Sequence, residues 1–174
     1  QLQGASNGAN SFVTVTAGFD NEGAVAGNLN VQANSLILQD GGKFTGSLSG
    51  GSQTAGEISL FVSDLIRIDN GSIVSTPLGA SAKGIEIVTK GLEVLGENGK
   101  IENDNFGTGT SAPLTITAEE VLVSDGGQIT LENENGPSGG IVITANELVE
   151  EKGGLISTLA FGGSNGGDID LELD

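Results

Sequence analysis

One pattern recurs along almost the whole chain with a regular spacing. In each copy, alternating apolar residues are followed by a polar residue with glycine and then by another apolar residue. The residues that open the copies are Leu29, Ile58, Ile85, Leu114, Ile141 and Ile169. They span 140 positions in five intervals of 29, 27, 29, 27 and 28, so the mean period is 28 residues. A repeat this regular predicts a chain built from stacked copies of one structural unit.

The clearest copy runs from Leu114 to Ile129, and its alternation is typical of half-buried β-strands. Asp125-Gly126 marks a corner, because aspartate tolerates and glycine readily adopts the left-handed backbone conformation. Similar pairs recur as Asp40-Gly41, Asn70-Gly71 and Asn98-Gly99. Each copy should therefore contain a long strand, a corner, a short strand, a turn, a third short strand and a loop rich in glycine and serine.

The 28-residue period requires each unit to pair with its own copy in the next turn, giving parallel strands about 4.8 Å apart. We therefore predict an all-β parallel β-helix, or solenoid, with about six rungs of roughly 28 residues and three short strands per rung. Residues 1–26 form a degenerate first rung or cap that includes a strand at 12–17, and residues 27–174 form the repeats. We read 146–153 as strand, and we expect the chain to be a piece of a longer protein.

Two rungs depart from this register. Ile66, Ile68 and Ile73 lie one step out of line, and an additional residue precedes Ile101. These offsets predict a bulge or a wider corner in each of the two turns.

Composition excludes several classes of function. The chain has 23 acidic and 6 basic residues and a formal charge of −17, so nucleic acid and anionic membrane surfaces are poor partners. No apolar run is long enough to cross a bilayer. Histidine, cysteine and tyrosine are absent, which leaves no recognisable nucleophile and base relay. We therefore predict no enzymatic activity, no catalytic, cofactor-binding or metal-binding residues, and no cofactor.

Short phrases recur at the corners and loops: Gly27-Asn28-Leu29, Leu36–Gly42, Asn103–Gly109, Ser157–Gly162 and Gly163–Ile169. They resemble the repeats of filamentous-haemagglutinin-type exoproteins, particularly the large cyanobacterial ones, over roughly residues 27–174. The resemblance implies a right-handed parallel β-helix that is exported by two-partner secretion and displayed at the surface of a Gram-negative cell. It also implies adhesion to a host-cell, glycan or cell-surface receptor.

Four groups of side chains are candidates for binding. Glu120 and Glu147 should stack near 5 Å apart, where calcium could bridge them, but we favour two solvated side chains because calcium needs six or more oxygens. The segment Gly162–Ile169 resembles a calcium-binding nonapeptide but has no tandem copies. Phe44 should be core. Phe106 and Phe161 should plug the interior at a corner, whereas exposure of both on one face would favour a binding surface.

The fourth group comprises the residues of the clearest copy that are expected to face outward: Thr115, Thr117, Glu119, Glu120 and Ser124. Asp40, Asp69 and Asp125 precede turn glycines and are better explained as turn residues than as acids.

The function that follows is a non-enzymatic extracellular shaft or adhesin segment that mediates adhesion or display. Three alternatives stay open: a surface fibre subunit that stacks end to end as a homo-oligomer, a polysaccharide-active β-helix enzyme, and a phage tail-spike or ice-binding segment. The apolar alternation up to Leu173 favours the first of these. The short loops count against the enzyme, which needs a walled cleft and convergent carboxylates.

Overall fold

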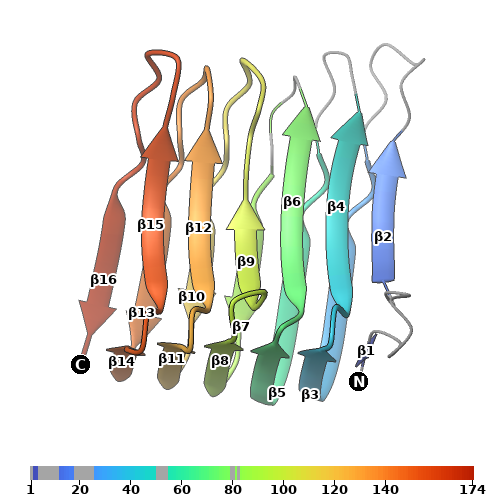
Figure 1. The fold of residues 1–174 in the computed structure, drawn as a ribbon. Coiled ribbons are helices and arrows are strands. Elements are labelled where there is room, and N and C mark those ends of the chain that lie inside the picture. Colours follow the sequence, from blue (N-terminus) through green and yellow to red (C-terminus); the bar gives the residue numbers. More distant parts are fainter. Residues whose placement is uncertain (1, 4–11, 18–25, 50–54, 79–80, 82) are drawn as a thin grey trace.

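The computed structural model describes residues 2–3, 12–17, 26–49, 55–78, 81 and 83–174 (Figure 1). None of these residues is helical, so no helix among them could cross a membrane. The described strands are β1 (Leu2–Gln3), β2 (Phe12–Ala17), β3 (Leu29–Gln39), β4 (Lys43–Ser49), β5 (Ile58–Asp69), β6 (Ser72–Leu78), β7 (Ile85–Val88), β8 (Gly91–Leu95), β9 (Lys100–Asn103), β10 (Leu114–Thr117), β11 (Glu120–Ser124), β12 (Gln128–Asn133), β13 (Ile141–Ala145), β14 (Glu147–Glu150), β15 (Leu155–Ala160) and β16 (Ile169–Leu173).

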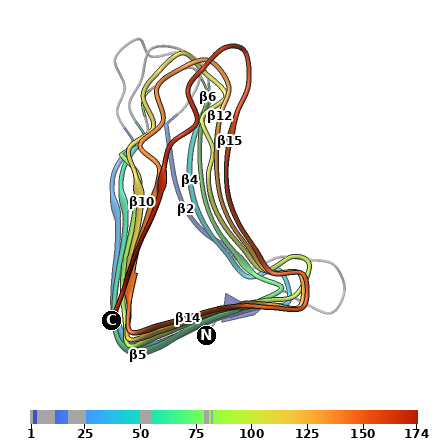
Figure 2. The same cartoon turned by 90° about the vertical axis from the view of Figure 1, so that its left-hand side faces the viewer.

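All pairings between these strands are parallel, as the repeat predicts. A ten-stranded sheet bends around one corner, and a six-stranded sheet with the order β15-β12-β9-β6-β4-β2 closes the coil. Viewed along the stack, the chain has a triangular outline, with β10, β14 and β15 on different walls (Figure 2). The fold is an all-β parallel solenoid of about five turns spaced about 28 residues apart, which confirms the predicted class and period.

Equivalent apolar residues stack in columns inside the coil. Leu114 pairs with Ile85 on one side and Ile141 on the other, and all three are buried. Phe44 pairs with Ile73 in the column that continues to Ile129, and it is only 4% exposed, which confirms its predicted place in the core. Each fully buried aliphatic side chain of this kind stabilises the fold by about 1.5–3 kcal/mol.

The corners follow the predicted chemistry with one exception. Asp40, Asn70 and Asp125 have φ angles of 50°, 53° and 54°, so each adopts the left-handed conformation. The prediction for Asn98-Gly99 is wrong, because the left-handed residue of that corner is Gly96, with a φ of 81°. The additional residue before Ile101 widens this turn, as expected: one more residue separates β8 from β9 than separates β11 from β12.

The predicted irregularity of the second rung is a bulge in β5. Ala33 pairs with Val62, but Ser35 pairs with Leu65, so β5 contains one more residue than β3 at this point. An even count from Ile58 would place Asp64 opposite Ser35, so the bulge displaces the register by one residue.

Two other predicted strands are present: β2 lies at 12–17 and β14 lies within 146–153. Most of the predicted first rung or cap, residues 1–26, falls outside the described residues.

Neighbouring rungs approach each other closely where a glycine follows the corner. A Cβ atom on Gly127 would lie 2.1 Å from the carbonyl oxygen of Val94, and one on Gly154 would lie 2.2 Å from that of Val123. Gly127 also donates its N–H to the carbonyl oxygen of Ser124, which closes the turn. Glycine is required here because any side chain would meet the backbone of the preceding rung.

Candidate functional site

The predicted carboxylate pair is adjacent but exposed. Glu120 pairs in register with Glu147, which confirms the stacking, and both side chains are exposed. Among the residues that the structure describes, no three acidic side chains lie close enough together to form a metal-binding group. Two exposed carboxylates offer too few oxygens for calcium, so the arrangement favours the solvated pair.

The turn acids differ in their environments. Asp40 and Asp125 occupy the left-handed corner positions, as predicted. Asp69 instead ends β5 and pairs with Arg67 at 3.1 Å, while Arg67 also contacts Glu93 at 2.6 Å. The interpretation of Asp69 as a turn residue is therefore wrong.

The outward set of the clearest copy is confirmed except at one position. Thr117, Glu119 and Glu120 are exposed and Thr115 is half-buried. Ser124 is only 1% exposed, and its hydroxyl lies within hydrogen-bonding distance of Asp125 at 3.2 Å and of Glu151 at 3.5 Å. The serine turns inward because the chain bends at the corner, where strand alternation no longer holds.

The two edge phenylalanines do not plug the interior. Phe106 is 43% exposed and Phe161 is 50% exposed, so the prediction of a buried plug is wrong. The core position beside Phe106 is occupied by Asn105, which is fully buried and pairs with the fully buried Asn133 in the next rung. Asn133 in turn pairs with Ala160, the residue before Phe161. The observation that would favour a binding surface is thus met.

The buried asparagines fasten the edge loops to the interior. The side-chain amide of Asn103 donates to the carbonyl oxygen of Ala112 at 2.8 Å, and that of Asn105 donates to Gly109 at 2.8 Å. The amide of Asn133 donates in the same way to Gly136. In the next rung the hydroxyl of Thr158 donates to the carbonyl oxygen of Gly167 at 2.8 Å. These bonds fix which side chains around them point outward.

Acidic and aromatic side chains meet on the outer side of β9, β12 and β15. The backbone bond from Asn105 N–H to Glu132 O, at 2.8 Å, sets Asp104 beside Glu132, and Glu132 pairs with Leu159. One step on, the bonds from Glu134 N–H to Asn105 O and from Phe161 N–H to Asn133 O, both 2.9 Å, place Glu134 between the two phenylalanines. We call this set the acidic–aromatic face: Asp104, Phe106, Glu132, Glu134, Leu159 and Phe161.

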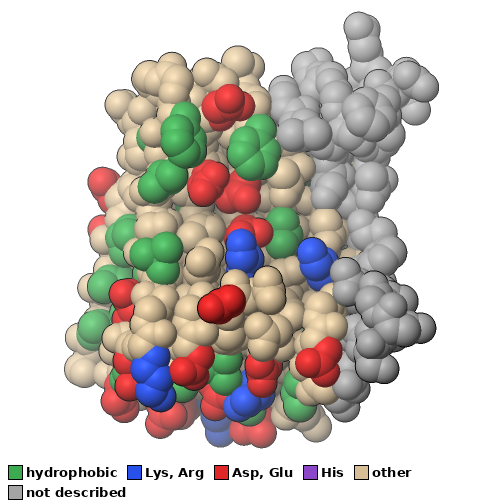
Figure 3. All heavy atoms as spheres, viewed as in Figure 1, with side chains coloured by type: hydrophobic (Ala, Val, Ile, Leu, Met, Phe, Trp, Pro, Cys, Tyr) green, Lys and Arg blue, Asp and Glu red, His purple; other side chains and the backbone are tan. Residues whose placement is uncertain are grey.

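Green and red side chains lie together on this side of the molecule in the space-filling view (Figure 3). None of the three carboxylates forms an ion pair with a described residue, whereas Glu102 beside them pairs with Lys100 at 2.9 Å. Burial, together with the charges of Glu102 and Glu132, raises the pKa of Asp104 from 3.8 to about 7. Above about pH 7 the face therefore concentrates negative charge that no ion pair in the described part of the chain neutralises.

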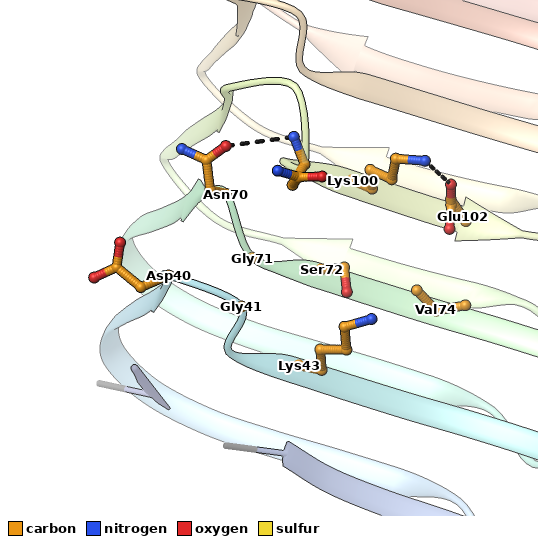
Figure 4. A pocket seen from close by; sticks show the side chains of 10 residues that line it. Asp40, Gly41, Lys43, Asn70, Gly71, Ser72, Val74, Lys100 and Glu102 are labelled. Carbon is orange, nitrogen blue, oxygen red and sulfur yellow. Dashed lines mark hydrogen bonds and ion pairs between the residues drawn. The ribbon is translucent and has the colours of Figure 1, made fainter. Parts of the chain in front are cut away.

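A separate hollow of about 530 Å³ lies at the corners of the first rungs, where Lys43, Ser72 and Lys100 line one side (Figure 4). Lys100 points toward Glu102 rather than into the hollow, and the asparagine and glycine turns form the opposite side. The lining gives no convergent set of acid, base or ligand groups.

The sequence reasoning missed Asp104, Glu132 and Glu134. Each of them lies an odd number of residues after the inward-facing Ile101 or Ile129. Strand alternation therefore predicts that all three side chains point outward, which is the signal that could have identified them.

Comparisons with protein-family models, curated proteins and solved structures found no match to this chain.

Proposed function

We propose that the chain is a segment of a non-enzymatic, extracellular β-helical shaft that mediates adhesion or display. The observation that supports this proposal best is the unbroken parallel pairing of equivalent strands over about five turns. Such a stack is quasi-one-dimensional, so its length grows with the number of rungs and its outer walls repeat as binding surfaces. We infer further that the coil is right-handed, has about six rungs and is exported by two-partner secretion, as the resemblance to filamentous-haemagglutinin-type repeats implies.

The test is a binding screen with the purified protein on immobilised glycans and on intact cells. A variant in which exposed acidic residues are exchanged for amides controls for attraction that depends only on net charge. We expect saturable binding to at least one surface and no turnover of any glycan or ester. Turnover that a single carboxylate-to-amide substitution abolishes would overturn the non-enzymatic proposal.

A second candidate is end-to-end stacking, which the last rung favours. Ile169, Leu171 and Leu173 continue the core columns, but they are 39%, 47% and 50% exposed, and the outer edge of β16 has no partner among the described strands. The first half of β3, Leu29 to Ala33, belongs to the same column and pairs on only one side among those strands. One copy's β16 could therefore pair with another copy's β3, which would make an open, head-to-tail fibre.

Sedimentation velocity over a wide concentration range tests this candidate. The variant Leu171→Gln should weaken association, whereas Glu172→Gln on the opposite face of the same strand should not. A strictly monomeric mass at all concentrations would exclude stacking by this chain.

A further inference from the structure

The exposure of Phe106 on the acidic–aromatic face does not come from the end of the stack. Phe106 follows β9, and its rung has neighbours on both sides, yet the ring is 43% exposed. With two rung spacings between them, Phe106 and Phe161 lie about 10 Å apart, with Glu134 between them. An extended chain or a flat side chain can enter a gap of this width.

Asp104 is the second observation that points to a ligand. Only 9% of its surface is exposed, and its Oδ1 atom has no hydrogen-bond partner in the described part of the chain. Because Asn103 and Asn105 point inward, strand alternation directs Asp104 to the outer side, toward Glu132. A buried carboxylate oxygen without a partner destabilises the structure, so a bound hydrogen-bond donor at this position would be favoured.

The chemistry of the face selects the ligand. Its three acidic groups have no ion-pair partner among the described residues, so they favour a positively charged ligand. Because those residues offer no metal-binding group, an organic cation fits better than a metal ion. Guanidinium groups bind carboxylates through two parallel hydrogen bonds and also stack on aromatic rings, which ammonium groups do less well. The combination of phenylalanine and carboxylate therefore favours arginine.

We propose that the acidic–aromatic face binds an extended, arginine-bearing segment of a partner protein, with one guanidinium group between Phe106 and Phe161. That group would pair with Glu134, and neighbouring donors of the segment would reach Asp104 and Glu132. Leu159 would contact the aliphatic part of the segment. This inference rests on the proposed function, because it names the kind of partner that a displayed shaft would hold.

The test uses fluorescence anisotropy with a labelled peptide in which three arginines alternate with glycines, at physiological ionic strength. We expect saturable binding that weakens about fivefold or more in Phe106→Ala and in Glu134→Gln, from the loss of a cation–π contact or a charge-assisted bond. The matched controls are Phe61→Ala, another exposed phenylalanine at 41%, and Glu119→Gln, an exposed acid on a different wall. Both controls should stay within about twofold of the parent protein, since neither residue belongs to the face.

A lysine version of the peptide separates recognition of arginine from general attraction to a chain with a charge of −17. Equal losses in controls and test variants, or equal affinity for both peptides, would overturn the proposal. Far-UV circular dichroism checks that each variant is folded, and Glu134→Gln, at an exposed position, keeps the test valid if Phe106→Ala unfolds. Cell-surface binding by a protein that ignores the arginine peptide would overturn this inference and leave the proposed function standing. Binding of the arginine peptide without cell-surface or glycan binding would support this inference and overturn the proposed function.

Discussion

Gly127 should not tolerate a methyl group, although its φ angle lies outside the left-handed region. A Cβ atom there would lie 2.1 Å from the carbonyl oxygen of Val94 and 2.6 Å from its carbonyl carbon, and real contacts of this kind do not fall below 3.0 Å. The backbones must therefore separate by 3.0 − 2.1 = 0.9 Å at this point. That is about a fifth of the 4.8 Å spacing between rungs. Forced backbone shifts of this kind cost about 1–3 kcal/mol, so Gly127→Ala should destabilise the fold by at least that amount.

Gly166→Ala is the matched control. Its Cβ would meet nothing closer than the Cβ of Ala160 at 3.7 Å, an ordinary contact, and its φ is likewise outside the left-handed region. This substitution should stabilise the protein by about 0.4–1 kcal/mol, because it restricts the unfolded chain. Urea unfolding followed by far-UV circular dichroism gives the midpoint and slope for both variants. If Gly127→Ala unfolds at or above the parent midpoint with the same slope, close rung contact at Gly127 does not limit the packing.

Three further perturbations test the core, the buried acid and the surface ion pairs. Ile116→Ala should cost about 2–5 kcal/mol, whereas Ile169→Ala should cost about 1 kcal/mol, because Ile116 is fully buried and Ile169 is 39% exposed; denaturant midpoints test this ranking. Because the pKa of Asp104 is raised from 3.8 to about 7, the folded state holds this proton more tightly than the unfolded chain does. Stability should therefore fall as pH rises from about 4 to about 7 by a few kcal/mol, and Asp104→Asn should remove that component. Arg67→Ala should cost no more than about 1 kcal/mol, and the loss should shrink in molar salt, because its ion pairs with Glu93 and Asp69 are partly exposed.

Each of these expectations has an outcome that contradicts it. Equal losses at Ile116 and Ile169 would mean that the last strand is packed as tightly as a middle one. A pH profile that Asp104→Asn leaves unchanged would place the titrating group elsewhere. A loss at Arg67 of several kcal/mol that salt does not alter would show that its side chain contributes packing rather than charge.

The columns of the core could be predicted from the sequence, because a nearly constant period shows which residues of neighbouring rungs pair with each other. Once equivalent residues recur every 28 positions, parallel pairing follows, and Ile85, Leu114 and Ile141 must stack. Where the period changes by one residue the prediction fails locally. The bulge in β5 shows this, since counting from Ile58 leads to Asp64, but the chain places Leu65 beside Ser35.

The exposure of Phe106 in the acidic–aromatic face could not be predicted. At this loop edge, hydrogen bonding rather than hydrophobicity decides which side chain is buried. A phenylalanine next to two asparagines suggests an inward ring and outward amides. The structure has the opposite arrangement. Asn105 is buried and its side-chain amide donates a hydrogen bond to the loop carbonyl oxygen of Gly109, whereas the ring of Phe106 is exposed. A loop carbonyl near the core needs a donor, and that need is invisible in a pattern of apolar residues.

Because side chains fasten the edge loops to the strands, a loop can change in length without disturbing the strands of its rung. Asn103 holds Ala112, and Thr158 holds Gly167, so in both rungs eight residues lie between the donor and the residue it fixes. Residues inserted between those two points would lengthen only the part of the loop beyond the fastening, while the strands on either side kept their partners. The edge is therefore where foreign peptides could be inserted, one per rung, to be presented at the spacing of the rungs, about 4.8 Å apart.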